Sequence, residues 1–222
     1  MKYYKFLNKD GTTPHGRAAW PMPKRGKPGK WLPKLKGDIV LCRNGYHVIT
    51  ADQLIPWLAP VLWEVEVCGT VVGDLEKYAG RQARLIRQVV AWNEGTMRLF
   101  AADCAERVLP LFEKERPNDD RPRKAIEAAR AYARGEITTY ELQRARDAAG
   151  QAAAARDAAG HAWAAARDAG DAARTAGAAA ARDAWAAAWD AGAAERQWQT
   201  EHLIEMLGIA ETLSTQEAIS RQ

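Results

Sequence analysis

The residues of this chain best suited to chemistry lie in one short segment, residues 42–47, which reads Cys-Arg-Asn-Gly-Tyr-His. Cys42 and His47, together with Cys68 or Cys104, have the side chains of zinc ligands. A structural zinc site needs four ligands in closely spaced pairs, and the sequence has no second pair, so no metal site is predicted. Cys42 and His47 also lack a nearby acid that would orient them as a nucleophile and its base.

The same segment therefore has a structural interpretation. We expect Cys42 to be a buried strand residue and His47 to form a hydrogen bond within the Asn44-Gly45 turn. Elsewhere the sequence has no carboxylate pair suited to acid–base catalysis and no phosphate-binding glycine motif. We predict a protein that is not an enzyme, with no catalytic residue and no cofactor.

Basic residues provide the second kind of candidate site. Residues 1–37 contain ten lysines and arginines and a single acid, Asp10. Such a segment attracts phosphates or acidic partners at long range, although a solvated lysine-rich loop has the same composition. A nucleotide-binding protein, acting as a sponge or resembling a transferase, would use the following candidate ligand-binding residues: Arg17, Arg43, His47, Arg81 and Arg84. Nucleic acid is a less favoured partner, because no recognition helix or series of stacking aromatics accompanies the basic residues.

The first hundred residues show the alternating pattern of strands. Residues 62–67 alternate most clearly, with Trp63 and Val65 on one face and the two glutamates on the other. Further strands are expected at residues 3–7, 39–42 and 82–92, and a short helix capped by Thr50 at residues 51–58. The loop at residues 8–37 is expected to be held on the body by Trp20 and Trp31. This order predicts a small α+β domain.

Alanine dominates the second half of the chain. Of the 50 residues from 145 to 194, 28 are alanine, which is the best helix former. Helices are expected at residues 102–115, with Cys104 and Phe112 on the inner face, and at 121–134, capped by Asp120. A third begins at Thr138 or Thr139. The alanine tract is expected to fold back near Gly170, because one straight helix would exceed the diameter of a globule. The prediction is an all-α helical bundle built from long Ala-rich helices.

Residues 3–92 resemble a domain of unknown function found in phage and prophage proteins. The resemblance lies in a C-x-x-G-aromatic-H turn formed by Cys42, Gly45, Tyr46 and His47, and in the strand from Trp63 to Gly69. It implies a fold and a genetic setting, but no chemistry.

Residues 103–208 resemble the all-α immunity proteins of bacterial polymorphic-toxin systems. The most specific match is the D-R-P-R-x-A-I-E-A segment that begins at Asp120, together with the closing segment from Trp198 to Leu203. The resemblance implies a protein that binds and neutralises something. The candidate partner-binding residues are Asp120, Arg121, Arg123, Trp163 and Trp189.

We therefore predict two domains, residues 1–97 and 98–222. The predicted function is a non-enzymatic neutralising protein of phage or bacterial conflict systems, of the immunity or anti-defence type. It would occlude a protein partner, such as a toxin or a defence component, or that partner's signal. A cytoplasmic location is expected, because no run approaches the roughly 20 apolar residues of a membrane span and no signal peptide begins the chain. The sequence predicts no particular oligomeric state.

Overall fold

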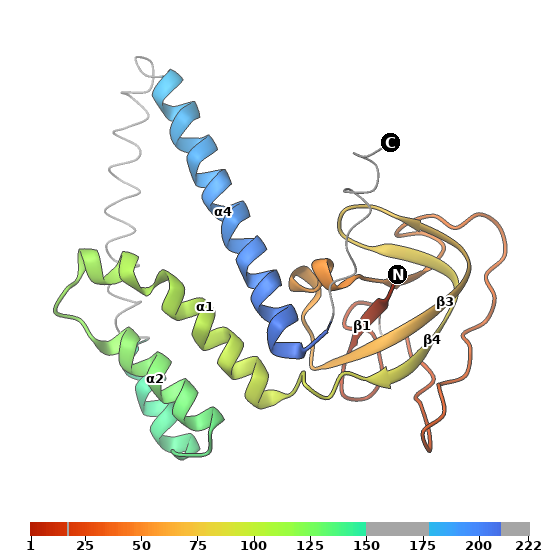
Figure 1. Cartoon of the computed structure of the whole chain (residues 1–222), viewed down its shortest axis with the longest axis horizontal. Coiled ribbons are helices and arrows are strands. Elements are labelled where there is room, and N and C mark those ends of the chain that lie inside the picture. Colours follow the sequence, from red (N-terminus) through yellow and green to blue (C-terminus); the bar gives the residue numbers. More distant parts are fainter. Residues whose placement is uncertain (17, 150–177, 210–222) are drawn as a thin grey trace. The chain divides into compact units, whose positions relative to one another are not determined.

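The computed structural model describes residues 1–16, 18–149 and 178–209, with backbone only for residues 108, 111, 115 and 178–192. The chain divides into two compact units, and each is described by itself. The first unit comprises residues 1–94 and the segment from residue 196 onward, and the second comprises residues 95–195. Figure 1 shows that the first unit contains the strands and that the second contains helices.

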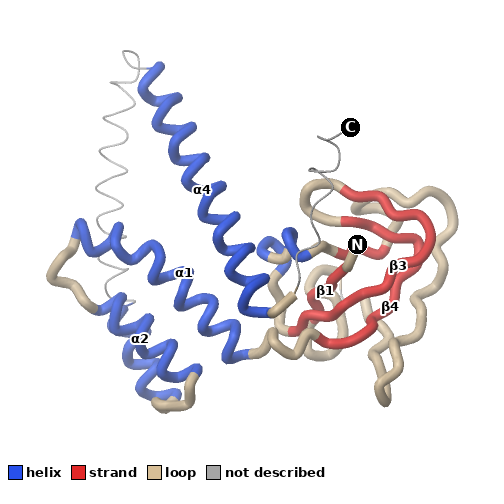
Figure 2. The backbone as a smooth tube through the Cα atoms, viewed as in Figure 1, coloured by secondary structure: helices blue, strands red, loops and turns tan. Residues whose placement is uncertain are grey.

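An antiparallel sheet of four strands builds the first unit (Figure 2). Its strands are β1 (Tyr3–Leu7), β2 (Tyr46–Val48), β3 (Val61–Gly73) and β4 (Tyr78–Gln88), in the order β1-β3-β4-β2. Two register shifts between β3 and β4 bend the sheet, as bulges do. The curl brings the two edges together. The Tyr4 N–H donates to the Ile49 carbonyl at 2.7 Å, and the Ile49 N–H donates back to Tyr4 at 3.0 Å.

The core lies against one face of this curled sheet. Trp63 and Val65 of β3 are buried there, as the alternating pattern predicts. The other buried members come from the other three strands and from the loop: Leu7, Trp20, Leu32, Val48, Ala83 and Leu85. The glutamates of β3 point to the other face, where each pairs with an arginine of β4 across the strands. These pairs are Glu64 with Arg87 and Glu66 with Arg84.

The basic loop follows the free part of the β4 edge. The backbone N–H groups of Gly29, Leu32 and Leu35 donate to three carbonyls of β4, at Leu85, Ala83 and Arg81. Trp20 is buried in the core, and Trp31 lies under the Arg84 guanidinium at 4.5 Å. This confirms that the loop is held on the body. Gly29 allows the approach, because a Cβ there would lie 2.1 Å from the Pro21 carbonyl oxygen.

Two local predictions for this unit are wrong. Instead of a helix at 51–58, the chain forms two separate 3-10 turns, η1 (Ala51–Gln53) and η2 (Ile55–Trp57). Pro56 explains the break, because it has no N–H to continue a helix and disfavours helical geometry in the residue before it. Residues 39–42 form no strand: Val40 bridges to Asn44 within a turn, where Cys42 is exposed with a φ of 62°.

In the second unit, α1 (Glu94–Glu115) and α2 (Arg121–Ala133) run antiparallel. Their contacts show the direction. Arg98 lies over Tyr132, Asp103 and Glu106 bind Arg130, and Glu113 binds Arg123. Ala102, Leu109 and Ile126 are buried between the two helices. The predicted Cys104 and Phe112 are only half-buried.

The ends of these helices follow local capping rules. The turn after α2 contains Gly135 with a φ of 75°, and the Gly135 and Glu136 N–H groups bond back to Tyr132 and Ala131. This is the helix end that the glycine predicts. Thr138 begins the next helical segment, residues 139–149, and exchanges hydrogen bonds with Glu141. The last described helix is α4 (Ala178–Leu207), in which Leu203 is fully buried.

The predicted fold class is wrong. In place of an α+β domain, the first unit is a curled antiparallel sheet, and its described N-terminal part, up to residue 93, contains 3-10 turns but no α-helix. In place of an all-α bundle built from long Ala-rich helices, the described residues show helices that follow the sheet in the chain, and they do not show such a bundle. The alanine tract at 150–177, with the expected fold-back at Gly170, lies outside the described residues. Alanine content predicts helix but not how helices pack.

The core of the sheet provides a direct test of this fold. Leu85 of β4 is fully buried, whereas Leu75, in the turn before β4, is 86% exposed. We expect Leu85→Ala to lower the free energy of unfolding by about 2–5 kcal/mol, because it leaves a cavity in the core. The matched change Leu75→Ala should alter it by less than about 0.5 kcal/mol. Urea unfolding of both variants measures the difference, and equal effects would contradict the assigned core.

Candidate functional site

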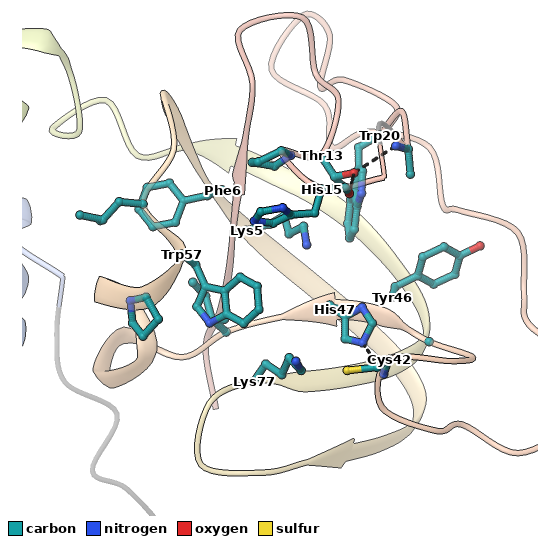
Figure 3. A pocket seen from close by; sticks show the side chains of 16 residues that line it. Lys5, Phe6, Thr13, His15, Trp20, Cys42, Tyr46, His47, Trp57 and Lys77 are labelled. Atoms are coloured by element: carbon teal, nitrogen blue, oxygen red, sulfur yellow. Dashed lines mark hydrogen bonds between the residues drawn. The ribbon is translucent and has the colours of Figure 1, made fainter.

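A cavity of about 570 Å³ lies in the first unit, next to the point where the sheet closes. Sixteen of the described residues line it, and none of these sixteen is acidic. Four carry basic nitrogen: Lys5, His15, His47 and Lys77. Four are aromatic: Phe6, Trp20, Tyr46 and Trp57. Figure 3 shows Lys5, His47, Trp57 and Lys77 around the same space.

Lys5 is the most unusual residue of the cavity. It is a half-buried lysine in β1, and burial lowers the pKa of its amine from 10.5 to about 8. Within the described part of the chain, the amine forms no hydrogen bond or ion pair, and it lies 5.8 Å from the centre of the Trp20 ring. Whether protonated or neutral, the Lys5 amine therefore has no carboxylate partner among the described residues.

His47 of β2 is held by the turn that precedes it. The Cys42 N–H donates to His47 Nε2 at 3.0 Å, so the predicted hydrogen bond within the turn is confirmed. A ring nitrogen that accepts is unprotonated, which places the proton of the neutral imidazole on Nδ1. Burial, together with the charges of Lys5 and Lys77, lowers the pKa of His47. His47 therefore favours the neutral form, and this hydrogen bond occupies the Nε2 lone pair that a metal would need.

The turn between β3 and β4 completes the wall. Asp74 accepts the N–H groups of Glu76 and Lys77 at 2.8 and 2.9 Å, which fixes the turn. Those bonds lower the pKa of Asp74. The Trp57 Nε1–H donates to the Glu76 carbonyl at 3.1 Å, and the Lys77 amine lies 5.1 Å from the centre of the Trp57 ring. The tryptophan and the lysine are therefore positioned together.

Of the predicted ligand-binding residues, only His47 is among the described residues that line this cavity. Arg81 donates to the carbonyls of Leu35 and Gly37, and Arg84 pairs with Glu66. Arg43 is exposed in the turn before β2, and Arg17 lies outside the described residues. Arg43, Arg81 and Arg84 are not among the residues that line the cavity with His47, and the assigned ligand contacts stay predictions.

Lys5 and Lys77 were missed by sequence reasoning. A signal for Lys5 was present. It lies two residues before Leu7, on the same face of β1, and it pairs with Trp63 of β3. Leu7 and Trp63 are both buried. A lysine on the buried face of a strand requires an explanation. For Lys77 no such signal exists, because its position depends on how the turn packs against Trp57.

The partner-binding candidates of the second unit lie at the start of α2. Asp120 is exposed and pairs with Lys124 at 2.7 Å, without capping the helix through its side chain. The predicted cap by Asp120 is therefore wrong: the side chain of Asp119, one residue earlier, accepts the Arg121 N–H at 3.3 Å and binds its guanidinium through both oxygens. Arg123 binds Glu113 of α1 through two hydrogen bonds of 2.8 Å, so this arginine joins α2 to α1. For the other two candidates, Trp163 lies outside the described residues, and the side chain of Trp189 is not described.

Comparison with protein families gives one match. Residues 87–206, more than half of the chain, match the family described as "Imm-5 like putative immunity protein". The chain belongs to this family. The matched segment includes α1, α2 and nearly all of α4, together with the segment that begins at Asp120. The searches of curated proteins and of solved structures found no match.

The family match agrees with the resemblance of residues 103–208 to immunity proteins. It begins at residue 87, so the resemblance of residues 3–92 to a phage domain has no counterpart in it. Among the described helices, none has an apolar stretch long enough to span a bilayer.

The buried amine of Lys5 predicts a particular dependence of stability on pH. The folded chain releases this proton near pH 8, whereas the unfolded chain holds it until about pH 10.5. Unfolding therefore takes up a proton between these values, and stability rises with pH across that window. Lys5→Met removes the effect. We expect the variant's advantage in free energy of unfolding over the native chain to be larger at pH 7 than at pH 10, as measured by urea unfolding. An advantage independent of pH would contradict the assignment.

Asp119 and Asp120 predict different stabilities for the same substitution. Asp119→Ala should lower the melting temperature clearly, because it removes the cap and both bonds to Arg121. Asp120→Ala should lower it much less, because an exposed pair with Lys124 contributes little. Thermal unfolding followed by circular dichroism distinguishes them. If Asp120→Ala is the more destabilising change, the capping assignment is wrong.

Proposed function

We propose that this chain is a non-enzymatic neutralising protein that blocks a protein partner, a toxin or a defence component, or that partner's signal. The observation that carries the proposal is membership of the immunity-type family over residues 87–206. Neutralisation by occlusion needs no reacting groups. It needs a complementary surface with a few anchoring residues.

The helical unit supports this proposal with a surface whose charged groups are already held in position. Arg121 and Arg123 each use two guanidinium nitrogens to bind one carboxylate, from Asp119 and Glu113. Arg130 binds Asp103 and Glu106 together. Groups fixed before binding lose less conformational entropy when a partner docks.

The start of α2 is the proposed contact surface. Asp120 is 61% exposed there, beside the half-exposed guanidiniums of Arg121 and Arg123. Residues of both charges therefore lie close together on one short stretch of helix. Such a pattern selects a partner by charge complementarity as well as by shape. Trp163 and Trp189 stay further candidates.

A phage or bacterial conflict system is the proposed setting, with the first unit as a phage-type module. The C-x-x-G-aromatic-H pattern of residues 42–47 supports this part through the resemblance to phage proteins. The proposed domains are residues 1–97 and 98–222, the proposed location is the cytoplasm, and nucleic acid is not the proposed partner.

Co-expression with the products of neighbouring genes tests the function. The full chain should protect cells from one such product and form a stable complex with it in size-exclusion chromatography. Charge reversal by Asp120→Arg should weaken this complex by about tenfold or more, the usual effect of reversing a charge at an interface. No protection and no complex with any neighbouring product would contradict the proposal.

A matched variant separates the contact surface from a general charge effect. Asp147 is an exposed acid of the same unit, in the helical segment 139–149, outside the motif at Asp120. Asp147→Arg should leave both affinity and protection within about twofold of the native chain, as expected for a residue outside the contact. If both reversals weaken the complex equally, the surface at α2 is wrongly assigned.

A further inference from the structure

The cavity of the first unit concentrates basic groups without neutralising them. In the sheet outside it, Arg84 and Arg87 pair with glutamates, and Arg81 donates to two carbonyls. Inside it, four side chains with basic nitrogen meet no acid among the sixteen lining residues. The nearby Asp74 lies outside the lining, with its carboxylate engaged by two backbone N–H groups.

Lys5 shows why this arrangement calls for a ligand. Taking an amine partly out of water, as in the half-buried Lys5, costs free energy unless an opposite charge or a hydrogen bond compensates. The described residues supply only the Trp20 ring, 5.8 Å away. Methionine would fill the same space without this cost. A group that destabilises the fold and faces a cavity is typical of binding sites.

Aromatic rings form the rest of the cavity wall. The Trp57 ring is held by its bond to the Glu76 carbonyl, and the Trp20 ring contacts Tyr46 edge-on at 6.1 Å between centroids. Phe6 is a further buried ring that lines the cavity. Rings held in this way provide flat apolar surfaces for a planar group. The volume of about 570 Å³ is that of a small-molecule site.

We infer that this cavity binds a small molecule in which a planar aromatic ring is joined to a phosphate, as in a nucleoside monophosphate. Lys5 and Lys77 bind the anion, and Trp57 provides the stacking surface for the ring. The His47 ring, with its proton on Nδ1, adds a neutral donor. This site is distinct from the proposed contact surface at α2, and it stands whether or not the chain neutralises a protein partner.

Calorimetry with the full chain tests the site through three probes: AMP, adenosine and inorganic phosphate. Lys5→Met should weaken the binding of AMP and of phosphate by about tenfold or more, the effect of losing one hydrogen bond between charged groups. The affinity for adenosine should not change. Trp57→Leu should weaken the binding of AMP and of adenosine by about fivefold or more, but not the binding of phosphate. The matched control Lys2→Met changes an exposed lysine just before β1, outside the cavity, and should alter nothing.

Folding and ligand source are checked in the same series. Lys5→Met should not lower the melting temperature, so a loss of binding cannot be assigned to unfolding. A hexanucleotide with and without a 5′-phosphate distinguishes a free nucleotide from a nucleic-acid end. If only the phosphorylated hexanucleotide competes with AMP, the cavity binds the phosphorylated end of a nucleic acid. If neither form competes, the ligand is a free nucleotide. AMP binding weaker than millimolar, equal effects of Lys5→Met and Lys2→Met, or competition independent of the phosphate would overturn the inference.

Discussion

Two backbone hydrogen bonds between Tyr4 and Ile49 hold the first unit in its curled form. They join β1 to the residue that follows β2, which are the two edges of the sheet in the order β1-β3-β4-β2. Without this closure, Lys5 on one edge strand and His47 on the other would lie at opposite ends of a four-stranded sheet. With it, both strands border one cavity, and the turn after β3 brings Lys77 to the same space. The candidate site therefore depends on sheet closure more than on any side-chain contact.

The charged residues on the two sides of that sheet differ in whether they are paired. On the outer face, Glu64 and Glu66 pair with arginines directly across the strands. The basic loop is anchored by N–H bonds along β4 and by Trp20 and Trp31, so its lysines are carried at the surface of a fixed segment. Towards the cavity, Lys5 meets no carboxylate among the described residues. Because surface pairs contribute little to stability and an unpaired buried amine costs much, Lys5 is the charged residue of the sheet whose role is hardest to explain by folding alone.

The helical unit is held together by a small core and by ion pairs. A small apolar core of Ala102, Leu109 and Ile126 is bordered by arginine–carboxylate pairs that join α1 to α2. In this arrangement both arginines of the D-R-P-R segment have structural roles: Arg121 is held by Asp119, the residue before the segment, and Arg123 binds Glu113 on α1. The same bonds fix the charged groups in space, which suits a binding surface. Membership of the immunity-type family and a structural role for the motif are therefore compatible.

The sequence by itself determined the features that depend on near neighbours. Alternation identified the buried face of β3, Gly135 and Thr138 marked helix ends, and the segment at Asp120 indicated the family. It predicted the wrong fold class, because alanine content specifies helix but not packing, and because Pro56 outweighs the apolar pattern at 51–58. The cavity was decided by tertiary structure alone. Lys5, His47 and Lys77 are distant in sequence, and the closure that unites them depends on backbone bonds that any residue types can form.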